Sequence, residues 1–187
     1  SPLVLGLGLA FTAGLFEETA RLAGAAVLKK KLSYKSMLSF GLGHGLCEVI
    51  LIAGMSQVNN LILCAALADP QGAAATAFLS GADPATLQAV AAQLTAATPA
   101  LVGLALVERV SAVLYHLFGT CLVFTAVKRG KPLYYAGALL AHTLFNFLAV
   151  MLNAWVGPWI MEAVLLAAGV CFGLYVWRAR RWFDAPC

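Results

Sequence analysis

The chain has 187 residues, of which 62% are hydrophobic and 11% are charged, and its formal net charge at pH 7 is +4. Soluble domains have about 25% charged residues, so this composition excludes an ordinary soluble domain. Long unbroken apolar runs indicate a membrane protein whose spans are helices, because the alternation of a membrane β-barrel is absent. The few basic residues form short clusters and give no reason to expect nucleic-acid binding.

Five apolar runs are long enough to cross about 30 Å of hydrocarbon at about 1.5 Å per residue. We expect spans at 2–28, 36–55, 99–127, 132–155 and 158–177. The predicted fold is therefore all-α, a polytopic transmembrane bundle that forms one domain over residues 1–187. Because the chain begins with Ser1 rather than Met, we also expect that an N-terminal part has been lost.

The basic residues predict the orientation of the spans. Ten of the twelve Lys and Arg residues lie in three segments, at 29–35, 128–131 and 178–181. The positive-inside rule places these segments in the cytoplasm and the opposite ends outside. We therefore expect a multi-pass protein of a cell membrane, the bacterial inner membrane in particular.

An outer loop at about 56–98 contains one more expected helix. Asp83 followed by Pro84 is typical of a helix start, with Asp as the N-cap and Pro at the first helical position. Apolar residues then recur at i, i+3, i+4 and i+7, namely Leu87, Val90, Ala91 and Leu94. We expect a short amphipathic helix at the outer interface or capping the bundle, with a plain packing spacer as the favoured alternative.

Ionisable residues inside a span are costly and normally mark function. This chain places many of them there, including all three of its histidines, and one amide joins them: Glu17, Glu18, Arg21, His44, Glu48, Glu108, Arg109, His116, His142 and Asn146.

Four of these residues, on four different spans, are predicted to lie at one depth. Measured from the basic cluster next to each span, at about 1.5 Å per residue, the depths are about 18 Å for Glu17, about 14 Å for His44, about 18 Å for His116 and about 17 Å for His142. Independent packing histidines would have no reason to agree. The agreement predicts one polar site near the membrane midplane.

Other polar residues extend this site or have structural alternatives. Glu48 and Asn146 lie one turn beyond His44 and His142 on the same helix faces. Arg21 could simply neutralise a carboxylate. The pair Glu108–Arg109 could be structural or a gate, and Glu162, near the outer end of the last span, is expected to reach water. Three glycines flank His44 and are expected to permit close helix packing: Gly41, Gly43 and Gly45.

The residue types allow three kinds of chemistry. A carboxylate and an imidazole can hold a water between them, with the carboxylate as general base, while a second histidine and an asparagine donate to an oxyanion. That arrangement suits amide hydrolysis without a covalent nucleophile. The same groups also suit proton coupling in a transporter, or metal ligation.

Three motifs in three spans carry a family resemblance. "FEETAR" at 16–21, "FGLGHG" at 40–45 and "HTLFN" at 142–146 resemble the motifs of the CAAX prenyl endopeptidase and bacteriocin-processing (CPBP) superfamily. "GLFEETAR", "GLGHGLCE" and the "ERV" of 108–110 with His116 more closely resemble the YhfC-like membrane peptidases. One departure concerns Arg21, which follows Glu18 after two residues, where the eukaryotic CAAX proteases have three.

The resemblance implies an intramembrane endopeptidase of the glutamate type that needs no cofactor and acts on a membrane-associated peptide or protein. Glu17 would activate water with His44, and the oxyanion site would be His142 and Asn146. Glu18 would belong to the same catalytic group, in support of Glu17. Other supporting roles would fall to Arg21, Glu48, Glu108, Arg109 and His116.

Two alternatives stay open. One is a metal-dependent peptidase, with zinc held by His44, Glu48, His116 and His142, although the chain has no HExxH motif. The other is a transporter or a membrane scaffold without catalytic activity.

Overall fold

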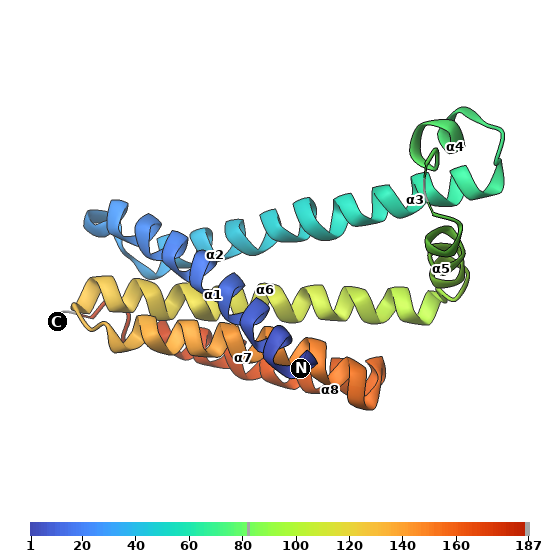
Figure 1. Ribbon diagram of the computed structural model, residues 1–187. Coiled ribbons are helices and arrows are strands. Elements are labelled where there is room, and N and C mark those ends of the chain that lie inside the picture. Colours follow the sequence, from blue (N-terminus) through green and yellow to red (C-terminus); the bar gives the residue numbers. More distant parts are fainter. Residues whose placement is uncertain (82, 186–187) are drawn as a thin grey trace. The chain divides into compact units, whose positions relative to one another are not determined.

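The structure is a computed structural model that describes residues 1–81 and 83–185 (Figure 1). Within these ranges the regular elements are all helices, which confirms the predicted all-α class. The chain divides into two compact units, the first comprising Ser1–Leu46 with Leu104–Cys187 and the second Cys47–Gly103. The single domain stays a prediction.

Five helices of the described chain are long and apolar enough to cross a membrane, as predicted. They are α1 (Pro2–Val27), the continuous helix Tyr34–Ala68, α6 (Pro99–Arg129), α7 (Leu133–Val156) and α8 (Pro158–Ala179). Proline stands at the start of α1, α6 and α8, where its missing N–H has no intrahelical partner to lose. Between α7 and α8 the chain turns at Gly157, whose φ of 79° favours glycine.

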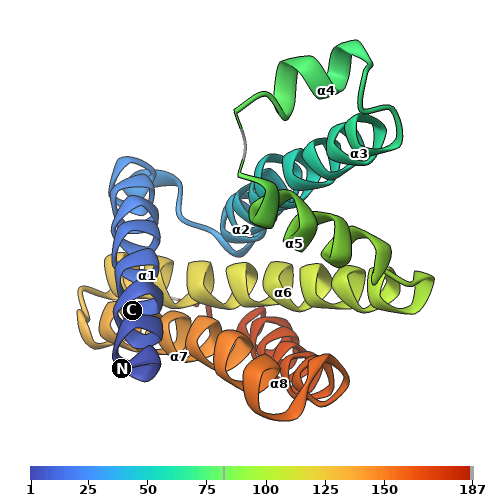
Figure 2. The ribbon, with the colours of Figure 1, turned by 45° about the vertical axis from the view of Figure 1, so that its right-hand side comes forward.

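In the first unit most of α6 is surrounded by other helices. Helix α1 packs along α7, and α7 packs against α8, while both Figure 1 and Figure 2 show α7 and α8 running beside α6. One buried apolar cluster joins α6, α7 and α8 through Tyr115, Phe145, Met161 and Leu165. Four polar residues of α6 are buried in the protein, namely Ser111, His116, Thr120 and Thr125.

Two of the three glycines near His44 permit close packing against α6. A Cβ atom on Gly41 would lie 3.1 Å from the Leu117 Cα, and one on Gly45 would lie 3.2 Å from the His116 Cβ. A Cβ on Gly43 would meet nothing within 4 Å. The packing prediction is therefore confirmed for Gly41 and Gly45 and is wrong for Gly43, which lies on the open side of the helix.

The second long helix extends further than predicted. Helix α2 (Tyr34–Glu48) continues through a π-helical segment, η2 (Val49–Gly54), into α3 (Met55–Ala68). The predicted end at residue 55 was therefore wrong. Polar residues follow that position, but they do not interrupt the backbone hydrogen bonds of a helix. A short 3₁₀ helix, η1 (Lys29–Lys31), connects α1 to α2.

The second unit contains the predicted extra helix. After α4 (Ala73–Phe78), helix α5 (Pro84–Thr95) begins at an Asp83 side chain that accepts a hydrogen bond from the Thr86 N–H. The members of the predicted stripe are the half-buried residues of α5, which packs against α3: Leu87, Val90, Ala91 and Leu94. The N-cap prediction is confirmed, and the stripe has a packing role.

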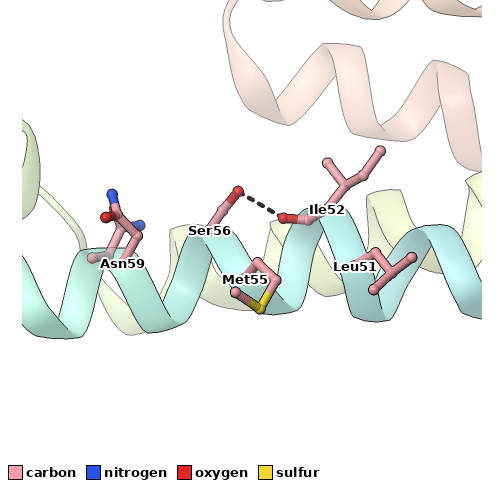
Figure 3. Close-up of a pocket in the computed structure, with 6 residues that line it drawn as sticks. Leu51, Ile52, Met55, Ser56 and Asn59 are labelled. Atoms are coloured by element: carbon pink, nitrogen blue, oxygen red, sulfur yellow. Dashed lines mark hydrogen bonds between the residues drawn. The ribbon is translucent and has the colours of Figure 1, made fainter.

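A hollow of about 590 Å³ lies along η2 and α3 in the second unit (Figure 3). Its lining combines apolar and amide side chains, namely Leu51, Ile52, Met55, Ser56, Asn59 and Asn60. Figure 3 shows the Ser56 hydroxyl directed at the Ile52 carbonyl, to which it donates a hydrogen bond of 2.7 Å. This bond ties a polar side chain to its own helix one turn back.

Candidate active site

A buried ion pair on α1 is the centre of the polar site. Glu18 and Arg21 are one helical turn apart, both side chains are 0% exposed, and an Arg21 Nη1 donates to Glu18 Oε1. The same carboxylate oxygen accepts from the Tyr115 hydroxyl at 2.8 Å and lies 2.8 Å from the His142 Nδ1. Full burial of a charge is tolerated only with such partners.

Arg21 also connects α1 to two histidines on other helices. Its Nη2 lies 2.8 Å from the Nδ1 of His116 on α6 and 3.3 Å from the Nδ1 of His44 on α2. Gly119 provides the space for this guanidinium, because a Cβ there would lie 2.6 Å from the Arg21 Nη1. Arg21 thus connects the Glu18 carboxylate to two of the three histidines.

Glu17 has a different environment from its neighbour Glu18. Its side chain is 31% exposed, and its oxygens lie 3.5 Å from the Nε2 of His44 and 3.8 Å from the Nε2 of His142. Among the described residues the Oε2 atom has no hydrogen-bond partner. Because the Glu18 side chain is fully buried, the partly exposed Glu17 is the carboxylate of this pair that a ligand could reach.

Glu17, His44 and His116 form a group with the donor types of a metal site. One donor atom from each lies within 4.8 Å of the others, and the rings of His44 and His116 are 4.8 Å apart between centroids. One carboxylate and two imidazoles are ligands that zinc accepts, with room for water in the remaining position. The donor types thus fit a zinc ion, although the positively charged Arg21 guanidinium lies beside both histidines.

Four of the predicted residues are not part of this group of side chains. Asn146 is half-buried on α7, and its side chain forms no hydrogen bond with the site among the described residues. Glu108 and Arg109 pair with each other on α6. Glu48 belongs to the second unit rather than to the unit that contains the site.

The prediction that Glu162 reaches water is wrong. Instead of reaching water, it is 3% exposed, and its Oε2 is buried without a hydrogen-bond partner among the described residues. The reason is the packing of α8, in which the flanking Met161 and Leu165 belong to the apolar cluster with Tyr115. Distance from a helix end does not give exposure when a neighbouring helix covers that face.

Tyr115 and Gly119 are site residues that the sequence reasoning missed. The Tyr115 hydroxyl donates to Glu18 and lies 3.1 Å from the Ala138 carbonyl oxygen, which orients the phenol between α1 and α7. The sequence did place both residues near a predicted site residue, because Tyr115 precedes His116 and Gly119 follows His116 by three residues. Helical spacing alone does not show that both face the same carboxylate.

The profile of the family described as YhfC intramembrane metalloprotease matches residues 1–171. The chain belongs to the YhfC family. It is also 32% identical over 151 residues to the uncharacterized membrane protein YhfC of Bacillus subtilis (strain 168), an alignment that covers 80% of this chain and 58% of the relative. The chain thus spans less than two thirds of the length of that relative. No solved structure matches the chain.

The family description corrects two expectations. A glutamate-activated water without metal was expected, together with the absence of a cofactor, whereas the family is described as metalloproteases and the structure groups Glu17, His44 and His116 as possible ligands. The metal-dependent alternative therefore fits better. A carboxylate beside a histidine serves equally as a base or as a ligand, so the sequence pattern could not separate the two. The wider CPBP placement stays a prediction.

Proposed function

We propose that this protein is a zinc-dependent intramembrane peptidase that hydrolyses a peptide bond in a membrane-associated peptide or protein. The observation that carries the proposal is the approach of Glu17, His44 and His116, whose donor atoms come from three helices and lie within 4.8 Å of one another. Membership of a family described as intramembrane metalloproteases supports the same reaction class.

Glu17, His44 and His116 are the residues that would hold the metal. A bound zinc ion would lower the pKa of a water molecule and polarise the scissile carbonyl. The side chains of Glu17 and His44 are 31% and 23% exposed, which leaves this side of the group open to a substrate. Glu18 is fully buried, and one of its oxygens contacts Arg21, Tyr115 and His142. Its role is therefore to position these side chains.

His142 is the residue best placed to move a proton. Its Nδ1 donates to the Glu18 carboxylate, so the lone pair of the neutral ring is on Nε2, which lies 3.8 Å from a Glu17 oxygen. Nε2 can take a proton during attack and return it to the leaving amine. The ionised Glu18 stabilises the imidazolium that forms, in the way a buried carboxylate supports a catalytic histidine.

The proposal includes the protein's place in the cell. The helices support a multi-pass membrane protein, with the lipid bilayer as its surroundings. We infer that the membrane is bacterial and that the three segments rich in Lys and Arg face the cytoplasm. The group of Glu17 and the histidines would then lie near the midplane, where a substrate would have to expose its backbone.

Metal removal tests this proposal directly. Purified protein in liposomes is incubated with a tagged single-span model protein, before and after chelation, and again after zinc is restored. Cleavage is expected to disappear on chelation and to return with zinc, and to be absent in the His44→Ala and His116→Ala variants. Gly43→Ala is the matched control, because its added methyl meets nothing within 4 Å. Undiminished cleavage by protein shown to contain no metal contradicts the proposal.

A further inference from the structure

Arg21 holds two of the three histidines in a form that does not suit a metal ion. A guanidinium has five N–H donors and no acceptor, so the Nδ1 atoms of His44 and His116 must accept from it. A neutral imidazole that accepts on Nδ1 has its proton on Nε2. Neither nitrogen of these two rings then has a lone pair to give to a metal.

His142 shows the opposite arrangement in the same site. Its Nδ1 faces Glu18, and an ionised carboxylate can only accept, so this ring has its proton on Nδ1 and its lone pair on Nε2. A carboxylate behind a histidine is the usual support of a metal-ligating imidazole. The contrast shows that the partner of Nδ1, rather than the ring itself, determines which nitrogen is free.

The buried ion pair has unused hydrogen-bonding capacity for a second arrangement. Among the described residues the Arg21 Nε and the Glu18 Oε2 both lack a hydrogen-bond partner, although both atoms are buried. A guanidinium and a carboxylate can form two parallel hydrogen bonds. If Arg21 took that form with Glu18, it would satisfy both atoms and release the two histidines.

We propose that Arg21 and a metal ion are alternative partners of His44 and His116, so that metal binding displaces Arg21 from both rings onto Glu18. The proposal rests on the metal site of the proposed function. Arg21 is then a positioning residue that lowers the affinity of the site for metal and keeps the empty site closed by hydrogen bonds. A metal dication bound to these rings would also repel the nearby Arg21 guanidinium, which favours the displacement of Arg21.

Histidine tautomers provide a direct test, because the chain contains only three histidines. Protein labelled with ¹⁵N only in histidine is examined by NMR in detergent at mildly alkaline pH, without metal and then with zinc. Without metal, two rings are expected with the proton on Nε2 and one with the proton on Nδ1. Zinc is expected to change the first two rings. Metal-free rings of His44 and His116 with the proton on Nδ1 would overturn the proposal.

Zinc affinity supplies a second readout, measured by competition with a chromophoric chelator. Arg21→Met is expected to bind zinc about 10- to 100-fold more tightly, the range typical of residues that act on metal ligands. The double variant Glu18→Gln with Arg21→Met leaves the net charge unchanged and avoids an unpaired buried carboxylate. It too is expected to bind more tightly. Unchanged or weaker binding in the double variant contradicts the displacement of Arg21.

The two proposals fail in different ways. If zinc changes no ring in the wild-type protein and His44→Ala leaves zinc binding unaltered, the metal site itself is wrong. If zinc binds through His44 and His116 but Arg21→Met gains no affinity, the metal site stands and the role of Arg21 is wrong.

Discussion

Glu17 and Glu18 are neighbours in sequence but have different physical tasks. Glu18 is 0% exposed and compensates the charge of Arg21, whereas Glu17 is 31% exposed and lies beside the Nε2 atoms of His44 and His142. Consecutive positions on a helix point about 100° apart, so one side chain enters the bundle while the other reaches the open side of the site. Glu18 is structural, and Glu17 is available to a ligand.

Substitution of the two carboxylates separates these tasks. Glu18→Gln leaves a buried Arg21 without its counter-charge and is expected to lower the free energy of unfolding by about 3–5 kcal/mol. Glu17→Gln is expected to change it by less than about 1 kcal/mol, because this side chain is partly exposed. Unfolding of both variants in detergent micelles measures the difference. Equal stability of the two variants would contradict the assignment.

A glycine substitution tests the space around Arg21. In Gly119→Ala the new methyl would lie 2.6 Å from the Arg21 Nη1 and 3.3 Å from the Glu18 Oε1. Such overpacking is expected to cost about 1–3 kcal/mol of stability and to abolish cleavage. Gly43→Ala provides the comparison, because its methyl enters open space and alanine is the better helix former by about 1 kcal/mol. A stable, active Gly119→Ala variant would show that the guanidinium does not need this space.

At the scale of helices, the sequence predicts the elements better than their surroundings. Starts at Pro2, Pro99 and Pro158 and long apolar runs locate the spans, because both signals are local. The continuation of the second span beyond residue 55 and the burial of Glu162 were not predictable in this way. The first depends on whether a helix continues through polar residues, and the second on which neighbour covers α8.

Glu162 gives a prediction for helix packing. A buried carboxylate oxygen without a partner costs about 1–3 kcal/mol, and an apolar side chain of similar length removes that cost. Glu162→Met is therefore expected to raise the free energy of unfolding by about that amount. Glu108→Met is the control, because the Glu108 side chain is 31% exposed and already paired with Arg109. A Glu162→Met variant that is less stable than the wild type would reveal a partner that supports this carboxylate.

At the scale of the whole molecule, the fixed rise of a helix explains why the site could be located from the sequence. Glu17, His44, His116 and His142 were expected at one depth on four spans, and the structure brings their side chains together. Rise per residue does not determine helix rotation or hydrogen-bond partners. Helix rotation and hydrogen-bond partners decide three things that the sequence did not predict. These are the position of Asn146, the contact of Tyr115 with Glu18, and the choice between base and metal ligand for Glu17.

The predicted orientation has its own test. The helix Tyr34–Ala68 has 35 residues, or about 52 Å, which exceeds a hydrocarbon core of about 30 Å. Its last turns, with the exposed Cys64, should project on the outer side. A variant that keeps only this cysteine is expected to react with a membrane-impermeant maleimide added to intact cells. A variant that keeps only the buried Cys121 should not react. Labelling of Cys64 only after the cells are broken would show that the orientation is the opposite of the predicted one.

The central claim is that Glu17, His44 and His116 together hold one catalytic metal ion. Elemental analysis of the purified protein measures this most directly, in the wild type and in the Glu17→Gln, His44→Ala and His116→Ala variants. We expect about one zinc per chain in the wild type. Each variant has an incomplete ligand set that lowers its zinc affinity by about 10-fold or more, so it should contain clearly less zinc after purification. Wild-type protein that cleaves its substrate without bound metal, or variants that retain full occupancy, would contradict the account.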